Sequence, residues 1–281
     1  MSYKIIGDSC CDYTEQMGGI PWLARVPIGI ELDGVQYLDD GSIDVPALLE
    51  HMDRAAAAPR TFCPAPGRYM QEFEGEAEDI YIVTLSDKLS GSYNSALTAK
   101  QTYAELGGKK NIHVFNSLSA AAGEDAAVLY IHDLCRQGLP FAEVCRLGDK
   151  FCREMHTFFI VENLDVFKKN GRLNHLEALL VDALRLKMIM GGDREGRICV
   201  LGKALSMSSA IKKMVAMIAV AVEKSGKQGR RVVMMGCECP ERLEMVRDMI
   251  MEKCPFCEAV LYHASGATAT YANRGGFNVC F

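Results

Sequence analysis

Ser90, Gly91 and Ser92 are the residues of this sequence best suited to bind an anion. They follow the apolar run 80–83, which is typical of a buried strand, and precede a helical pattern over residues 96–106. At a helix start, several backbone N–H groups lack partners and the positive end of the helix dipole points outward, so a carboxylate or phosphate binds well there. Serine is also a preferred helix cap, and this structural role is the simpler local interpretation.

Further polar side chains follow other predicted strands or lie in a stiff loop. The carboxyl ends of parallel strands meet at one edge of a sheet, which is where open α/β sheets bind ligands. The segment 60–66 contains two prolines and is expected to be an ordered loop, since proline disfavours both a helix interior and a central strand. The polar residues at these places are Asp8, Ser9, Thr61, Asn116 and Ser117.

The sequence carries none of the common catalytic or nucleotide-binding motifs. It has no Gly-x-Ser-x-Gly elbow, no phosphate-binding Gly-x4-Gly-Lys-Ser/Thr loop and no dinucleotide-binding glycine pattern after a strand. The six histidines show no spacing typical of paired metal ligands. The polar residues therefore predict a site that binds an anion but has no obvious pair of nucleophile and base.

Two of the cysteine pairs, Cys237 with Cys239 and Cys254 with Cys257, resemble a zinc site or a redox pair. The helix predicted over residues 241–253 is roughly 20 Å long at ~1.5 Å per residue, so the pairs cannot share one tetrahedral metal. The second pair also follows a helix rather than opening one, so the helix dipole does not lower its thiol pKa. We therefore expect no metal or redox cofactor, and interpret the thiols as small buried hydrophobes.

Composition indicates an ordinary globular protein. Its 281 residues, 49% hydrophobic and 24% charged, are enough for two medium domains. The formal net charge of −5 gives no broad basic surface, which argues against nucleic acid as a main partner. No apolar run approaches the ~20 residues needed for a transmembrane segment, and the first residues do not fit a signal peptide. We therefore expect a cytoplasmic protein.

The order of the predicted elements indicates an α/β protein of two domains. Strands and helices alternate through residue 155, which predicts an N-terminal mostly parallel sheet flanked by helices. From residue 156 the pattern is mixed α+β, so we predict domains 1–155 and 156–281, with the loop and helix 61–78 able to pack on the second domain. The predicted hairpins cover 26–38 and 185–201, and the predicted helices include 44–57, 67–75, 120–135, 141–155, 173–184, 206–224 and 241–253.

Taken in order, several short motifs resemble the DegV family over essentially the whole chain. Their shared order and spacing are more specific than any one motif alone. The motifs are Asp8-Ser9, the Gly-x-x-Tyr-x-Asp stretch from Gly34 to Asp39, Thr61 ahead of Pro64, Leu89 to Ala96, Asn116-Ser117, and Asn163-Leu164 followed by Asn170 to Leu173.

The resemblance implies that a long-chain fatty acid is held between two α/β domains, with its carboxylate bound by hydroxyl groups. The sequence departs from the family pattern at three places: Phe62 replaces a polar residue, Tyr271 stands where relatives carry a histidine, and Leu205 lies near the place of a family arginine. The residues implied for the carboxylate are Thr61, Ser90, Gly91 and Ser92. Those implied for a secondary head-group or partner-docking role are Arg172, Tyr271, Ser117 and Phe62.

The best understood role of that family is the binding subunit of a bacterial fatty acid kinase. The resemblance therefore implies a non-catalytic lipid carrier without a cofactor, which presents its acid to a separate kinase subunit and makes transient membrane contact. Two other interpretations stay open. The chain could be an enzyme or binding protein for a small anionic or phosphorylated ligand at Ser90–Ser92, or a relative that lost ligand binding and acts through protein contacts.

Overall fold

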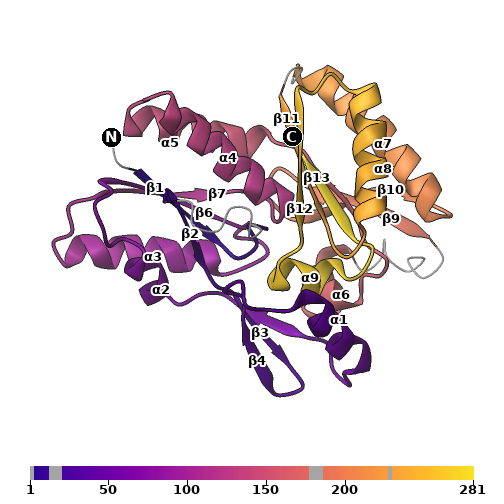
Figure 1. Cartoon of the computed structure of the whole chain (residues 1–281), viewed down its shortest axis with the longest axis horizontal. Coiled ribbons are helices and arrows are strands. Elements are labelled where there is room, and N and C mark those ends of the chain that lie inside the picture. The colour runs from indigo at the N-terminus through magenta and orange to yellow at the C-terminus, as the bar shows by residue number, and fades with distance from the viewer. Residues whose placement is uncertain (1–2, 13–20, 177–185, 227–229) are drawn as a thin grey trace.

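The chain folds into two halves, each built on its own β-sheet, with a small third sheet below them in Figure 1. The computed structural model describes residues 3–12, 21–176, 186–226 and 230–281, so the helix predicted over 173–184 lies mostly outside the described residues. The predicted α/β fold class is confirmed. No helix within these ranges combines the length and apolar character needed to cross a membrane.

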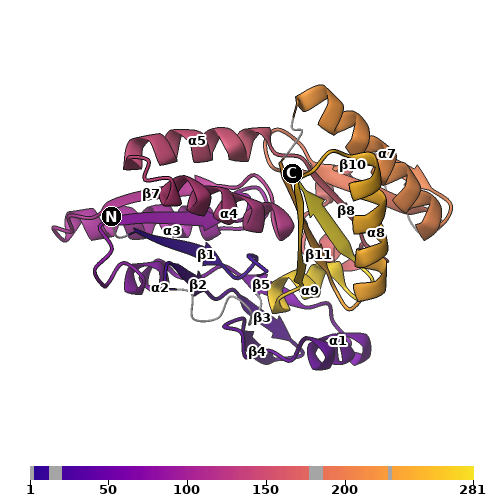
Figure 2. The same ribbon diagram turned by 45° about the horizontal axis from the view of Figure 1, so that its top comes forward.

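The first half is a four-stranded sheet in the order β2-β1-β6-β7, and every neighbouring pair in it is parallel. Ile5 and Tyr81 belong to the core under α4 and α5, whereas Ile6 and Ile82 pack toward α2 and α3. Helices thus cover both faces (Figure 2), which explains the continuous apolar runs of these strands. The elements are β1 (Tyr3–Asp8), β2 (Leu23–Val26), β6 (Asp79–Thr84), β7 (Asn111–Asn116), α2 (Pro66–Gln71), α3 (Ser92–Glu105), α4 (Ala122–Arg136) and α5 (Phe141–Glu154).

The second half is a six-stranded mixed sheet in the order β10-β9-β8-β13-β11-β12. Helices α7 and α8 cover one face, where Met214 and Val246 pack near Val279 of the strand β13. The opposite face contacts α4 and looks toward the first half. The predicted hairpin is confirmed as the antiparallel pair β9 and β10. The elements are β8 (Thr157–Ile160), β9 (Lys187–Gly192), β10 (Ile198–Ala204), β11 (Arg231–Gly236), β12 (Glu258–His263), β13 (Phe277–Cys280), α7 (Met207–Ser225) and α8 (Pro240–Lys253).

The third sheet has the order β4-β3-β5, and its β3–β4 pair confirms the hairpin predicted around Asp33-Gly34. The prediction of a loop over 60–66 was wrong in its first part, because Arg60–Phe62 form the strand β5, antiparallel to β3. A three-residue edge strand ends before Pro64, so the missing proline N–H costs no ladder hydrogen bond. The strands are β3 (Gly29–Leu32), β4 (Val35–Leu38) and β5 (Arg60–Phe62).

Helix α9 (Gly266–Ala272) joins this small sheet to the second half. It contacts β3, α1 (Val45–Arg54) and the short helix α6 (Asp165–Lys169). Elements that come early in the chain therefore lie against the C-terminal helix, as Figures 1 and 2 both show. The sequence predicted neither α9, which has only seven residues, nor a separate strand β2.

Candidate functional site

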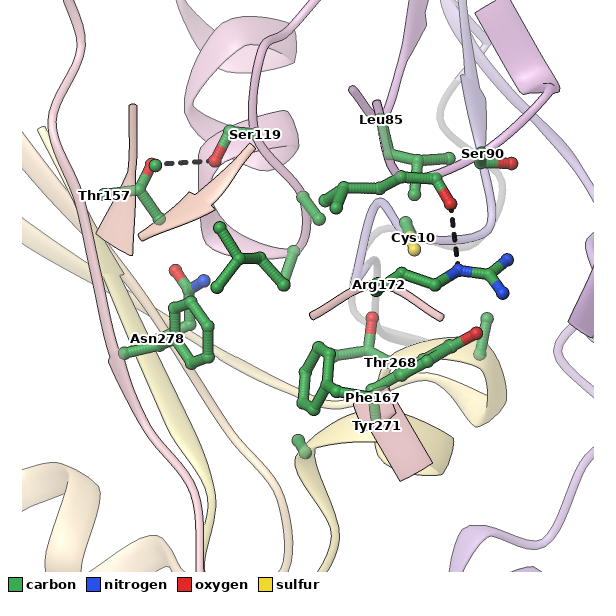
Figure 3. Close-up of a pocket in the computed structure, with 18 of the residues that line it drawn as sticks. Cys10, Leu85, Ser90, Ser119, Thr157, Phe167, Arg172, Thr268, Tyr271 and Asn278 are labelled. Atoms are coloured by element: carbon green, nitrogen blue, oxygen red, sulfur yellow. Dashed lines mark hydrogen bonds between the residues drawn. The ribbon is translucent and has the colours of Figure 1, made fainter. Parts of the chain in front are cut away.

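A mostly apolar cavity lies between the two halves of the molecule, at the edge where the parallel strands end (Figure 3). Its volume is about 120 Å³. A single water needs about 10–15 Å³ on this measure, so the space is far larger than a packing defect. Leu85 and Ile28 line it from the first half, and Phe159, Phe167 and Ile198 from the second. The cavity can therefore hold an extended apolar ligand.

One end of the cavity carries hydroxyl groups and a guanidinium. The hydroxyl of Thr61 lies 2.8 Å from that of Tyr271, and Ser90 contributes a third hydroxyl. Arg172 Nε donates to the carbonyl of Leu89 at 3.2 Å, and its guanidinium lies 5.9 Å from the centre of the Tyr271 ring. Throughout the described ranges, no carboxylate forms an ion pair with Arg172. This end of the cavity can therefore bind an anion.

Tyr271 at this end belongs to helix α9, and residues early in the chain form hydrogen bonds to the start of that helix. The two carboxyl oxygens of Asp39 accept hydrogen bonds from Gly266 N at 3.1 Å and Ala267 N at 2.9 Å. Ser265 N donates to Asp12 Oδ1 at 2.9 Å. These carboxyl groups satisfy N–H groups at the helix start that have no partner within the helix. Asp39 of the Gly-x-x-Tyr-x-Asp motif is thus explained as a group that positions α9.

Tyr271 stays neutral at this site. Burial raises the pKa of its phenol, although the hydrogen bond with Thr61 and the charge of Arg172 oppose that rise. A neutral phenol donates one hydrogen bond but carries no charge. The charge that faces an anionic ligand therefore comes from Arg172 and not from residue 271.

Five of the eight predicted site residues line the cavity: Thr61, Phe62, Ser90, Arg172 and Tyr271. Ser92 is fully buried behind Ser90, with 3.1 Å between the two hydroxyl oxygens. Gly91 is the N-cap of α3, and a Cβ built on it would meet Cys63 Sγ at 3.0 Å. Ser117 is buried and donates to the carbonyl of Ser119 at 3.2 Å. The binding roles of these residues stay predictions.

Besides Arg197 and Thr268, the predicted site residues omitted three polar residues that line the cavity, Ser119, Thr157 and Asn278. Ser119 Oγ and Thr157 Oγ1 lie 2.7 Å apart. Of the three, Asn278 could have been recognised from the sequence, because it is a single amide within the apolar strand 277–280. Figure 3 shows all three on the side of the cavity away from Arg172.

Four carboxyl groups are buried near the cavity but do not line it: Asp8, Asp12, Glu124 and Asp125. Asp8 accepts hydrogen bonds from Cys10 N at 3.0 Å and from Leu85 N at 3.1 Å, which joins the ends of β1 and β6. Burial raises the pKa of Asp8 to about 6 and that of Asp12 to about 7. Burial and neighbouring carboxyl groups raise the pKa of Glu124 and of Asp125. This cluster connects loops and does not line the cavity, although Asp12 Oδ2, Glu124 Oε2 and Asp125 Oδ2 have no hydrogen-bond partner among the described residues.

The cysteine pairs lie where the sequence placed them, because Cys239 precedes α8 and Cys254 follows it. All twelve cysteines are free thiols. In the described part of the chain, no three His, Cys, Asp or Glu side chains are grouped so that they could hold a metal ion.

A sequence model of the family described as "Uncharacterised protein, DegV family" matches residues 2–281. The chain belongs to the DegV family. A DegV domain-containing protein of Streptococcus pneumoniae is 33% identical over 282 residues, which cover 98% of this chain and 97% of that protein. The resemblance inferred from the motifs is thereby confirmed.

Solved structures of other DegV proteins share the whole fold. A protein from Ruminococcus gnavus, refined with vaccenic acid, is 38% identical with a TM-score of 0.94, and the match covers 100% of this chain and 99% of that one. The Streptococcus pneumoniae Fatty Acid Kinase (Fak) B3 protein, loaded with linoleic acid, is 33% identical with a TM-score of 0.89, over 100% of this chain and 99% of that one.

Proposed function

We propose that this DegV protein is a carrier that binds a long-chain fatty acid in the cavity between its halves. The observation that carries the proposal is the pairing of an apolar cavity with one end made of hydroxyls and a guanidinium without an acidic partner among the described residues. Solved structures of two similar DegV proteins contain vaccenic acid and linoleic acid, which supports the same class of ligand here.

The apolar lining supplies the binding free energy. Each buried methylene contributes roughly 0.8 kcal/mol, so an acyl chain of about sixteen carbons gains ample free energy even after the cost of ordering it. The head-group end needs only to keep the carboxylate hydrogen-bonded once it leaves water. Thr61, Ser90 and Tyr271 supply neutral hydroxyls for this, and Arg172 supplies the opposite charge.

The protein acts as a non-catalytic subunit that presents its acid to a separate kinase, which forms the acyl phosphate. No side chain at the described head-group end pairs a nucleophile with a general base, and this supports placing the chemistry on a partner. The similarity to the Fak B3 protein supports a kinase as that partner. We further propose a cytoplasmic location, with transient membrane contact when the acid is exchanged.

A small phosphorylated ligand at the start of α3 is the weaker alternative. Ser92 N already donates to Ser90 Oγ at 3.2 Å, and the Ser92 side chain is fully buried. One of the N–H groups at this helix start is therefore already hydrogen-bonded within the protein. The apolar cavity beside it would also be left without a role.

Mass spectrometry of an organic extract from the natively purified protein tests the proposal. We expect a stoichiometric fatty acid of about 14 to 18 carbons, the length whose burial gives high affinity. A preparation without lipid that also fails to bind added fatty acid would overturn the carrier function. The kinase step is tested separately, by adding a bacterial fatty acid kinase with ATP and trapping acyl phosphate with hydroxylamine. If a loaded carrier yields no hydroxamate, the proposed kinase partner is wrong, but the proposed binding of a fatty acid still holds.

A further inference from the structure

The far end of the cavity contains a buried amide. Side chains alternate between the two faces of a strand, so in β13 Phe277 and Val279 join the core under α7 and α8, while Asn278 lies on the face toward the cavity. Only 7% of Asn278 is exposed. Its neighbours across the sheet are Met235 and Phe159, so the adjacent side chains on both sides are apolar.

The amide of Asn278 has no hydrogen-bond partner in the described part of the protein. Its Oδ1 is buried and unpaired, and its Nδ2 makes no hydrogen bond there. A buried polar group without a partner destabilises a protein by about 1–3 kcal/mol, so such groups call for a physical explanation. A ligand group that completes the hydrogen bonds of the amide is one such explanation.

Two hydroxyls lie at the same end of the cavity. Ser119 Oγ and Thr157 Oγ1 are 2.7 Å apart, and the Thr157 hydroxyl also lies 3.8 Å from Cys280 Sγ. Figure 3 shows this pair and Asn278 on one side of the cavity, with Ser90, Arg172 and Tyr271 on the other. A purely hydrocarbon chain with its carboxylate at Arg172 would place methylenes against these three polar residues.

We propose that this distal end recognises a hydroxyl group on the acyl chain, so that the preferred ligand is a hydroxylated long-chain fatty acid. The inference rests on the proposed carrier function and specifies its ligand. A hydroxyl both donates and accepts, so it can donate to Asn278 Oδ1 while it accepts from Nδ2 or from the Ser119–Thr157 pair. A methylene can do neither and would leave the amide unpaired.

Competition binding tests this preference. The probes are octadecanoic acid and a series of octadecanoic acids that each carry one hydroxyl, at positions from the middle of the chain to its end. We expect the native protein to bind at least one hydroxylated member about two- to tenfold more tightly than octadecanoic acid, because one neutral hydrogen bond is gained. If every hydroxylated acid binds more weakly than the parent acid or equally to it, the proposal is wrong.

Asn278→Leu is the decisive variant, since leucine has a similar size but no polar atoms. We expect the preference to reverse by about tenfold, because a hydroxyl would then be buried without a partner. Met235→Leu, a change of an apolar neighbour on the same face, should shift all acids equally and leave their ratio unchanged. If the ratio of the affinities for hydroxylated and parent acids is unchanged in Asn278→Leu, the amide does not recognise the hydroxyl group.

Thermal unfolding of the ligand-free protein separates this role from a structural one. If Asn278 is kept for a ligand, Asn278→Leu should raise the midpoint of unfolding, because an unpaired amide is replaced by an apolar side chain. A lowered midpoint would indicate that the amide stabilises the fold and would overturn the proposal. The carrier function fails independently, when octadecanoic acid and all hydroxylated acids fail to bind the native protein.

Discussion

Two groups of polar residues lie side by side at the junction of the two halves, and they differ in what their polar atoms contact. In the head-group end of the cavity, Thr61, Tyr271 and Arg172 keep hydrogen-bonding capacity and a positive charge directed at the cavity. In the buried carboxyl cluster, both oxygens of Asp8 and Oδ1 of Asp12 accept hydrogen bonds from backbone N–H groups of neighbouring loops. The first group lines the cavity and is available to a ligand, whereas the second lies outside the lining and connects loops of the fold.

The binding site therefore depends on residues outside the cavity lining. Asp39 lies outside the cavity lining, yet it fixes the start of α9 and so the position of Tyr271. Changes in the head-group end should therefore alter affinity, whereas changes in the carboxyl groups should alter stability first.

The largest effect is expected for Asp39→Ala. This change removes two hydrogen bonds to the start of α9 and leaves Arg25, whose guanidinium lies 3.2 Å from Asp39 Oδ1, without this carboxylate. Because breaking a buried ion pair costs about 3–5 kcal/mol, we expect the free energy of unfolding to fall by that amount in chemical denaturation. Asp40→Ala, at the exposed neighbouring position, is the control and should change stability by under about 1 kcal/mol. Similar values for both variants would contradict the role given to Asp39.

The pH dependence of stability should report on the buried carboxyl cluster. The pKa of Asp12 is raised to about 7 in the folded protein from an ordinary value of 3.8, so the folded state binds more protons than the unfolded state between these values. The stability that this proton provides is complete below about pH 4 and is lost as the pH rises through about 7. Asp125, which also carries a raised pKa, acts in the same direction, while the charge of Arg25 opposes the rise at Asp12.

Denaturation measured from pH 4 to pH 8 with Asp12→Asn tests this prediction. The asparagine can still accept the hydrogen bond from Ser265 N but does not titrate. We expect the fall in unfolding free energy across this range to be smaller in the variant by an amount on the order of 2–4 kcal/mol, since one pKa unit corresponds to about 1.4 kcal/mol. A pH profile that is parallel to that of the native protein would place the titrating group elsewhere.

Arg172→Gln should weaken fatty acid binding without lowering stability to a similar degree. A hydrogen bond to a charged group contributes about 1.5–3 kcal/mol, so we expect affinity to fall about ten- to a hundredfold by isothermal titration. Arg197 also lines the cavity, but its guanidinium lies 3.9 Å from Glu195, so Arg197→Gln should have a smaller effect. Equal losses in the two variants would mean that general positive charge, and not the position of Arg172, holds the carboxylate.

Much of the fold and several residues of the head-group end could be predicted from the sequence. The division of the polar residues into two groups could not. Alternating apolar runs and helical patterns predicted the parallel sheet, the hairpins and most helices, because each is a local consequence of side-chain periodicity. The spacing of motifs indicated Thr61, Ser90, Arg172 and Tyr271, which the structure brings to one end of the cavity.

What the sequence could not show is which polar side chain points where. Ser90 and Ser92 are two residues apart in the same motif, yet one lines the cavity and the other is buried behind it. Asp39 and α9 are more than two hundred residues apart, and no local pattern signals that contact. The same holds for Asn278, whose significance depends on the two strands that flank it in the sheet.

The smallest effect on binding is expected for Tyr271→Phe. The variant keeps the ring under Arg172 but removes the hydroxyl that lies 2.8 Å from that of Thr61. Loss of one neutral hydrogen bond should weaken fatty acid binding by about 0.5–1.5 kcal/mol. Tyr262→Phe is the matched control, since this hydroxyl is buried, has no hydrogen-bond partner among the described residues and lies outside the cavity lining. We expect that control to leave affinity unchanged and to preserve or raise stability. An equal loss of affinity in both variants would mean that the hydroxyl of Tyr271 does not contact the head group.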